Sequence, residues 1–155
     1  MQPKFKTVIG DASCFIVLFK IEELELLREV FEEVFTTTEI AKEFGHPLPS
    51  WVKIRSVTDK SRQLSFEHEV DSGEASALAL SFEIKNAIVI IDDYKARKLA
   101  EKLQINYTGT LGLILRAKQE GIIPSVKELL LKIKSTNFRY SEEILMQILR
   151  DAGEE

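Results

Sequence analysis

The feature that most constrains the fold is the continuous apolar run Ala-Ile-Val-Ile-Ile at residues 87–91, which is followed directly by Asp92 and Asp93. Such a run, rich in β-branched residues, is typical of a strand inside a parallel sheet with both faces covered. Parallel strands are joined by crossover connections, which are usually helical and right-handed. The rest of the chain should therefore alternate between strands and helices.

Strand and helix patterns do alternate along the chain. Further β-prone segments lie at residues 6–10, 34–37, 52–57 and 105–107. Helical patterns lie near residues 13–19, 24–31, 38–44, 71–86, 94–103, 110–121, 125–134 and 141–151. The alternation at 52–57 indicates an edge strand, and residues 59–70 fit either a helix or a loop. The predicted fold class is α/β, a three-layer α/β/α arrangement around a central, mostly parallel sheet with extra C-terminal helices.

Length and composition favour one domain over residues 1–155, because a chain of 155 residues with 45% hydrophobic content can bury a full core. No apolar run reaches the roughly 18 residues of a membrane span, and residues 1–4 lack the apolar segment of a secretory signal. We therefore expect a soluble, cytoplasmic protein. Cys14 is the only cysteine, so any metal must be held by oxygen or histidine.

Charge is distributed unevenly, although the net charge is only -4. Residues 1–93 carry 10 Lys or Arg against 17 Asp or Glu, whereas residues 94–140 carry 10 against 3. One part of the chain is acidic enough to hold a metal, and another is basic enough to contact phosphates. Ordinary solvated helix faces would produce the same distribution.

Four acidic residues occupy positions from which they can reach one edge of the sheet: Asp11, Glu43, Glu74 and Asp92. Asp11 and Asp92 directly follow strands, and in an open parallel sheet sites form outside the carboxyl ends of the strands. Glu43 and Glu74 lie on helices that adjoin strands. Two carboxylates about 5 Å apart repel by roughly 3 kcal/mol at an effective dielectric of about 20, so such a cluster requires a cation or protons. Carboxylate oxygens suit Mg²⁺ and similar divalent metals.

A purely structural role explains Asp92 better than it explains Asp11. Asp92 can cap the helix that follows it, and Asp93 beside it competes for the position of metal ligand. Asp11 ends an apolar strand, where a charge is costly unless it is used. The choice between Asp92 and Asp93 stays open on the sequence alone.

Capping boxes account for some of the other acids. The segment Asp71-Ser72-Gly73-Glu74 fits a capping box in which Glu74 is the partner of the cap. The segment Thr36-Thr37-Thr38-Glu39 fits a second one, which explains Glu39 and leaves Glu43 without a local structural role. Glu43 is therefore either a ligand or a solvated side chain.

Other site chemistries find little support. His46 and His68 lie in or beside segments predicted as loops, and no H-E-x-x-H motif occurs. Cys14 lies on an apolar helix, where cysteine usually acts as a small buried hydrophobe. Neither G-x-G-x-x-G nor a Walker G-K-[ST] motif occurs, which argues against a nucleotide cofactor.

With these residues the chain resembles the PIN-domain nucleases, and more closely the prokaryotic branch related to VapC toxins. The resemblance covers nearly the whole chain. Its motifs are Val-Ile-Gly-Asp-Ala-Ser at residues 8–13, Glu39-Ile-Ala-Lys-Glu43, residues 72–80, residues 90–93 with 96–100, and residues 107–112. Two departures occur: Cys14 stands where this branch often has proline, and the aspartate at residues 92–93 is doubled.

The resemblance implies a PIN-like fold and hydrolysis of RNA phosphodiester bonds that depends on Mg²⁺ or Mn²⁺. The family's four acids, in chain order, would be Asp11, Glu43, Glu74 and Asp92. Ser13 would orient Asp11 or the phosphate. Contacts to the RNA backbone would come from Lys95, Arg97 and Lys98.

Two functions follow from these observations. The first is a metal-dependent endoribonuclease that is the toxin of a toxin-antitoxin pair, with an antitoxin protein as partner and a homodimer as the assembly. The alternative is a catalytically weak or silent PIN-like module that binds nucleic acid or a protein. A phosphotransfer receiver would place paired acids after the first strand, and a haloacid-dehalogenase-type phosphatase would need an aspartate at Ser13, so both are disfavoured.

Overall fold

The computed structural model describes residues 5–155, and its strands form one parallel sheet in the order β3-β2-β1-β4-β5. All four neighbouring pairs are parallel. The strands are β1 (Thr7–Gly10), β2 (Glu33–Thr37), β3 (Val52–Arg55), β4 (Ala87–Ile90) and β5 (Tyr107–Thr108). The predicted α/β class is confirmed. Residues 1–4, where the sequence shows no secretory signal, lie outside the described residues.

Helices connect the strands and extend the chain beyond the sheet. They are α1 (Ala12–Lys20), α2 (Leu26–Val30), α3 (Thr38–Phe44), α4 (Lys60–Phe66), α5 (Ser72–Ser81), α6 (Tyr94–Lys102), α7 (Thr110–Gln119), α8 (Val126–Lys134) and α9 (Glu142–Asp151). The undecided segment 59–70 forms α4, whose N-cap Asp59 accepts a hydrogen bond from the N–H of Arg62 at 3.0 Å. Such a cap stabilises a short helix of otherwise polar sequence.

Helix α5 is shorter than predicted, since it ends at Ser81 and not near residue 86. After Ser81 the backbone changes to tighter turns, because the N–H groups of Phe82 and Glu83 donate to the carbonyls three residues back, at 3.2 and 2.8 Å. The carboxylate of Glu83 also accepts hydrogen bonds from the backbone N–H groups of Thr58 and Asp59, at 3.0 and 3.1 Å.

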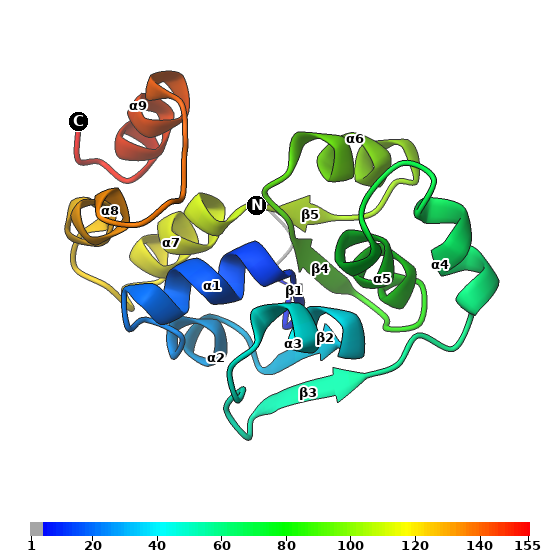
Figure 1. Cartoon of the computed structure of the whole chain (residues 1–155). Coiled ribbons are helices and arrows are strands. Elements are labelled where there is room, and N and C mark those ends of the chain that lie inside the picture. The colour runs from blue at the N-terminus through cyan, green and yellow to red at the C-terminus, as the bar shows by residue number, and fades with distance from the viewer. Residues whose placement is uncertain (1–4) are drawn as a thin grey trace.

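Helices cover both faces of the sheet (Figure 1). Helices α1, α2 and α7 lie on one side and α5 and α6 on the other, with α4 outside α5 and with α8 and α9 outside α7. Every residue of β1 and β4 is buried, as the apolar run at 87–91 predicted, whereas three of the four residues of the edge strand β3 are exposed. Within residues 5–155, no helix has the length and apolar character that crossing a membrane requires.

The chain reverses its direction of winding between β1 and β4. From β1 it proceeds outward through β2 to β3, and from β4 it proceeds to β5 on the other side. Gly10 pairs with Ile90 in the register, and the N–H of Asp11 donates to the carbonyl of Ile90 at 3.2 Å. Ligands of such sheets bind at the carboxyl ends of the strands that flank the reversal. Asp11 directly follows β1, and Asp92 lies two residues after the end of β4, so both lie at this reversal.

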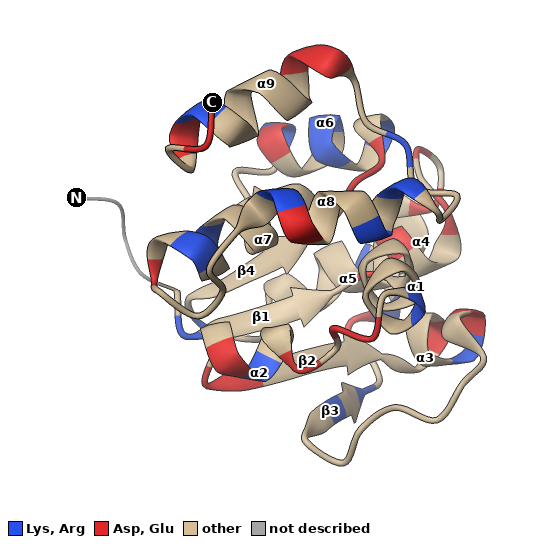
Figure 2. Cartoon of the chain, turned by 90° about the vertical axis from the view of Figure 1, so that its left-hand side faces the viewer, with Lys and Arg blue, Asp and Glu red and all other residues tan. Residues whose placement is uncertain are grey.

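Part of the positive charge lies on two helices of the basic segment. Figure 2 shows Lys and Arg on α6 and α8, two helices within the basic segment 94–140. The four predicted site acids lie instead around α5, which contacts β1, β4 and α3. None of these four acids lies on α6 or α8.

Candidate functional site

Asp11 lies where β1 ends, at the centre of the sheet. It occupies the N-cap position of α1 with extended backbone, yet its side chain makes no capping hydrogen bond. The residue is only 5% exposed. A buried carboxylate that does not serve the adjoining helix is costly unless it interacts with something else, so helix capping does not explain this residue.

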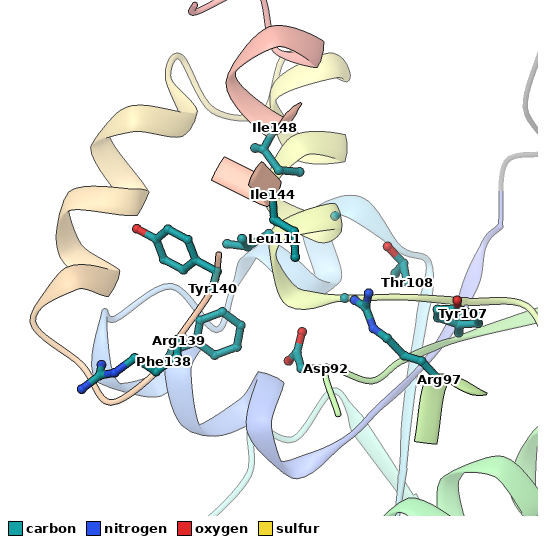
Figure 3. A pocket seen from close by; sticks show the side chains of 12 residues that line it. Asp92, Arg97, Tyr107, Thr108, Leu111, Phe138, Arg139, Tyr140, Ile144 and Ile148 are labelled. Carbon is teal, nitrogen blue, oxygen red and sulfur yellow. The ribbon is translucent and has the colours of Figure 1, made fainter. Parts of the chain in front are cut away.

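Asp92, labelled in Figure 3, accepts hydrogen bonds from three donors that belong to Ser13 and Thr110. The hydroxyl groups of Ser13 and Thr110 donate to Oδ2 at 2.9 and 2.6 Å, and the N–H of Thr110 donates to Oδ1 at 2.8 Å. Ser13 therefore orients Asp92 and not Asp11, which corrects one of the two roles expected for it. Thr110, which is fully buried, was not predicted as a site residue, although it lies within a motif that carried the resemblance.

Asp93 serves the helix that follows it. Its Oδ2 accepts a hydrogen bond from the N–H of Ala96 at 3.1 Å, which makes Asp93 the N-cap of α6. The capping role considered for Asp92 thus belongs to its neighbour. Of the two aspartates, Asp92 is the one that does not cap α6; its carboxylate accepts instead the N–H of Thr110 at the start of α7.

Glu74 takes part in the predicted capping box at the start of α5. The side chain of Asp71 accepts the N–H of Glu74 at 2.8 Å, and the carboxylate of Glu74 accepts the N–H of Asp71 at 3.4 Å. Asp71 was predicted only as a cap, but its charge also acts on Asp11, Glu43 and Glu74. The cap thus adds a negative charge to the site that sequence reasoning missed.

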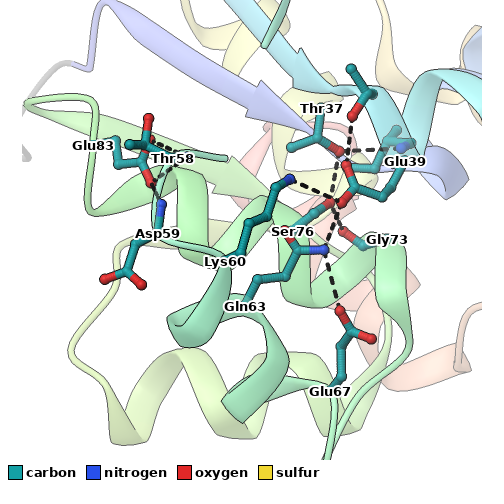
Figure 4. A network of polar contacts seen from close by, with 12 residues as sticks. Thr37, Glu39, Thr58, Asp59, Lys60, Gln63, Glu67, Gly73, Ser76 and Glu83 are labelled. Carbon is teal, nitrogen blue, oxygen red and sulfur yellow. Dashed lines mark hydrogen bonds and ion pairs between the residues drawn. The ribbon is translucent and has the colours of Figure 1, made fainter. Parts of the chain in front are cut away.

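Glu43 lies on the last turn of α3, which spans its predicted range but has a different N-cap from the predicted one. Thr37 is the N-cap, so the capping box predicted for Thr36 and Glu39 does not form. Glu39 is nevertheless used elsewhere: one of its carboxylate oxygens accepts a hydrogen bond from Nε2 of Gln63 at 2.6 Å (Figure 4). Glu43 keeps no capping duty, as predicted.

Buried hydroxyl groups join α3 to α5 (Figure 4). The N–H of Ile40 donates to Oγ1 of Thr37 at 3.2 Å, and the hydroxyl of Ser76 donates to the carbonyl of Gly73 at 2.6 Å. Because the Ser76 proton is used there, Thr37 donates to Ser76 across 2.6 Å. Thr37 and Ser76 are fully buried. These bonds fix against each other the two helices that carry acids of the site.

Burial raises the pKa of Asp11 to about 7. The N–H of Ala12 opposes the rise, and three nearby carboxylates add to it, namely Asp71, Glu43 and Asp92. Such a carboxyl group keeps its proton to a higher pH than usual, and a nearby positive charge favours its ionised form. Its surroundings therefore favour either a proton or a cation.

Glu74 and Glu43 respond to the same surroundings. Burial, followed by the charges of Asp71, Asp11 and Asp93, raises the pKa of Glu74 to about 8. Burial, followed by the charge of Asp71, also raises the pKa of Glu43. The predicted acids are thus close enough to influence one another.

Two glycines leave room beside the acids. A Cβ atom at Gly73 would lie 2.8 Å from Oε1 of Glu43, and a Cβ atom at Gly109 would lie 2.9 Å from Oδ1 of Asp92. Among residues 5–155, no three His, Cys, Asp or Glu side chains converge into a ready metal cage. Mg²⁺ does not need one, since it usually takes one or two carboxylates and keeps several waters. The site offers carboxylate oxygens, the kind of ligand that Mg²⁺ and Mn²⁺ prefer.

The three basic residues predicted to contact RNA lie on two sides of α6. Lys95 and Lys98 line a hollow together with the exposed Tyr94. Arg97 instead lines a cavity together with Asp92, and its Nε donates to a backbone carbonyl at 3.0 Å (Figure 3). Of the three, Arg97 is the one that shares a cavity with a predicted site acid.

The doubly wound sheet and the coupled carboxylates place the chain among α/β proteins with an acidic site at the carboxyl edge of a parallel sheet. The model of a PIN-domain family matches residues 7–154. The chain therefore belongs to the PIN-domain family, whose members are generally nucleases. No curated protein matches the sequence.

Proposed function

We propose that this PIN-domain protein is a metal-dependent endoribonuclease that hydrolyses RNA phosphodiester bonds. The observation that carries the proposal is the state of Asp11, whose pKa burial and three neighbouring carboxylates raise to about 7. A carboxyl group held in this way, at the strand ends where ligands of such sheets bind, gains most from a bound cation.

The residues divide into those that would hold the metal and those that position them. The ligands would be drawn from Asp11, Glu43, Glu74 and Asp92. A bound Mg²⁺ or Mn²⁺ would lower the pKa of a water and neutralise charge on the scissile phosphate. Ser13 and Thr110 keep the carboxylate of Asp92 in one orientation. Arg97 would contact the same phosphate, and Lys95 and Lys98 would extend the basic surface along the RNA backbone.

Replacing Asp11 by Asn tests the proposal, because the change removes a charge and keeps the shape. We expect Asp11→Asn to lose cleavage of RNA in Mg²⁺ or Mn²⁺, and the unchanged protein to lose it when EDTA is added. The control is Glu29→Gln, an equivalent change at an exposed position of α2. Undiminished cleavage by purified Asp11→Asn would show that the proposed site is wrong.

A catalytically silent binding module is the alternative, and the lack of a ready metal cage among residues 5–155 favours it. Titration with Mn²⁺ separates the two, since a ligand that binds the native state raises the melting temperature. The nuclease should show a rise that Asp11→Asn reduces. A silent module should show no Mn²⁺-dependent rise in either protein.

We also propose that the protein is a toxin of the VapC-related branch, with an antitoxin protein as partner and a homodimer as the assembly. The support is the resemblance of the motifs around Asp11, Glu43 and Asp92. Expression in growing cells should then arrest growth, and Asp11→Asn should not. Growth that continues unchanged with the active protein would remove the toxin role and leave the nuclease proposal standing.

A further inference from the structure

Two cavities meet at Asp92, and the connection between α8 and α9 lies between them. The larger has a volume of about 430 Å³ and is lined on one side by Asp92 and Arg97. The smaller has a volume of about 360 Å³ and is lined by Asp92, Ser13 and the outer face of α1. Phe138 and Arg139 line both cavities. The C-terminal part of the chain therefore forms a wall of the acidic site.

Phe138 is the aromatic side chain of this wall. Its ring lies on the side of Asp92 opposite Arg97 (Figure 3). Two contacts hold Phe138 in this position. Its N–H donates to Oγ1 of Thr136 at 3.2 Å, and its ring packs with its centroid 6.4 Å from that of the Tyr140 ring. The side chain is only partly buried, so part of its surface remains available within the cavities.

We propose that Phe138 stacks on a nucleobase of a single-stranded RNA next to the cleaved phosphate. The inference rests on the proposed nuclease function and specifies the form of its substrate. Aromatic side chains bind bases of any sequence through their faces. Arg97 lines the same cavity beside Asp92, which supplies positive charge for an adjoining phosphate. The guanidinium of Arg139 points away from Asp92 (Figure 3) and donates to the carbonyl of Thr136 at 3.3 Å.

The form of the substrate follows from the position of the ring. A base within a duplex is already stacked and paired, so it must leave the helix before it can lie against a protein side chain. Both cavities are large enough for a base, and both reach Asp92. The bases of a single strand are unpaired. A single strand can therefore place a base on Phe138, and the adjoining phosphate at the acids, without the free-energy cost of opening a duplex.

The test compares Phe138→Leu with Phe82→Leu. Both changes remove an aromatic face and keep an apolar side chain. Phe82 is 47% exposed and follows the end of α5, at the opposite edge of the sheet. Each is combined with Glu74→Gln, which should block cleavage. Fluorescence anisotropy then measures binding to a labelled RNA of about ten nucleotides, as a single strand, as a duplex, and with an abasic nucleotide at successive positions.

We expect Phe138→Leu to bind the single strand roughly fivefold to tenfold more weakly than Phe82→Leu does, and both to bind the duplex equally. An abasic nucleotide at one position should weaken RNA binding by Phe82→Leu, which keeps Phe138. The same nucleotide should not weaken RNA binding by Phe138→Leu any further. Equal affinities of the two Leu variants for the single strand would overturn the proposal and assign Phe138 to packing or to a protein partner. That result is distinct from failure of the nuclease proposal, in which the unchanged protein cleaves no RNA.

Discussion

At the scale of single residues, the positions of acids that follow strands could be predicted from the sequence. Their contacts with segments far away along the chain could not. Asp11 follows an apolar strand, so its place at the sheet edge could be inferred from the sequence. The donors to Asp92 could not be inferred, because Ser13 and Thr110 lie 79 and 18 residues away from it. The charge contributed by Asp71 was hidden by its evident role as a helix cap.

The raised pKa values of Asp11 and Glu74 predict that the metal-free protein loses stability as the pH rises. Below pH about 4 these groups are protonated in both states. Between about 4 and 8 the unfolded chain releases protons that the native state retains, since the native pKa values are about 7 and about 8. Stability from these groups therefore falls across this interval and changes no further above it. Differential scanning fluorimetry at several pH values measures the effect.

The stabilisation by Mn²⁺, measured in the same way, should increase with pH. A cation competes with protons for the carboxylates, so the rise in melting temperature caused by Mn²⁺ should be larger at pH about 8 than at pH about 5. In Asp11→Asn the metal-free pH dependence should become shallower, because one raised pKa is gone. A melting temperature that increases from pH about 5 to 8 without metal, beyond what Asp11→Asn also shows, would contradict the raised values.

Gly109 should be intolerant of a side chain for reasons of space. A Cβ atom there would meet Arg97 and would lie 2.9 Å from Oδ1 of Asp92. We expect Gly109→Ala to lower kcat/KM for RNA cleavage about tenfold or more. The control is Gly121→Asn, because nothing lies within 4 Å of a Cβ atom at Gly121 and Asn tolerates its positive φ. Activity of Gly109→Ala equal to that of the control would show that cleavage does not require the present positions of Arg97 and Asp92.

At the scale of secondary-structure elements, the buried hydroxyl groups between α3 and α5 give the sharpest prediction. Ser76→Ala leaves the hydroxyl of Thr37 without its acceptor in a fully buried place, which costs about 1–3 kcal/mol. Ser81→Ala is the matched control: its hydroxyl donates three residues back along the same helix, at 2.6 Å to Leu78, as that of Ser76 does to Gly73. Chemical denaturation should show a larger loss of unfolding free energy for Ser76→Ala.

The double variant Thr37→Val with Ser76→Ala tests whether the two hydroxyls act as a pair. Thr37→Val leaves the N–H of Ile40 without its cap in the single and in the double variant. Removing both hydroxyls leaves neither of them without its partner, so the double variant should lose less free energy than the sum of the single variants. Strict additivity would mean that the bond between them contributes nothing to the junction of α3 and α5.

Element types could be predicted better than element ends. Helix α3 (Thr38–Phe44) matches its predicted range, because a threonine cap precedes it and Gly45, in a left-handed conformation, closes it. The predicted cap was nevertheless one residue early. Three successive threonines offer the same chemistry, and the contact that selects Thr37 as cap comes from Ser76, 39 residues away.

At the scale of the whole molecule, Glu154 holds the C-terminal helices to the rest of the chain. Its carboxylate accepts hydrogen bonds from the N–H groups of Val126 and Lys127, at 2.7 and 3.1 Å, and pairs with Lys118 at 3.1 Å. Burial opposes the charge, but these donors outweigh it and lower the pKa of Glu154 to about 2. One side chain thus joins the start of α8, the end of α7 and the residues after α9.

Glu154→Gln should therefore destabilise the protein by about 2 kcal/mol, the usual contribution of hydrogen bonds to a charged group. The control is Glu155→Gln, since the carboxylate of Glu155 pairs with Arg150 at an exposed position. Because the native pKa of Glu154 is lowered, its contribution is present above pH about 4.5 and is lost as the pH falls toward 2. Equal melting temperatures for the two variants at neutral pH would contradict this role.

The broad plan of the molecule could be predicted, and the wall of the site could not. The order of strands and helices follows from local patterns, and parallel strands bring their carboxyl ends to one edge. Nothing local indicates that the connection between α8 and α9 returns to Asp92. That return depends on how α9 packs on α7, and the two helices lie far apart along the chain.

The hydrogen bonds from Thr110 to Asp92 bear on when the proposed activity can appear. A chain grows from its N-terminus, so Asp11 leaves the ribosome well before Asp92, and Thr110 follows later still. Until Thr110 has emerged, Asp92 lacks two of its three donors and β4 lacks its outer neighbour β5. The site is therefore complete only after more than two thirds of the chain has been made, and the proposed activity would begin only at that stage of synthesis.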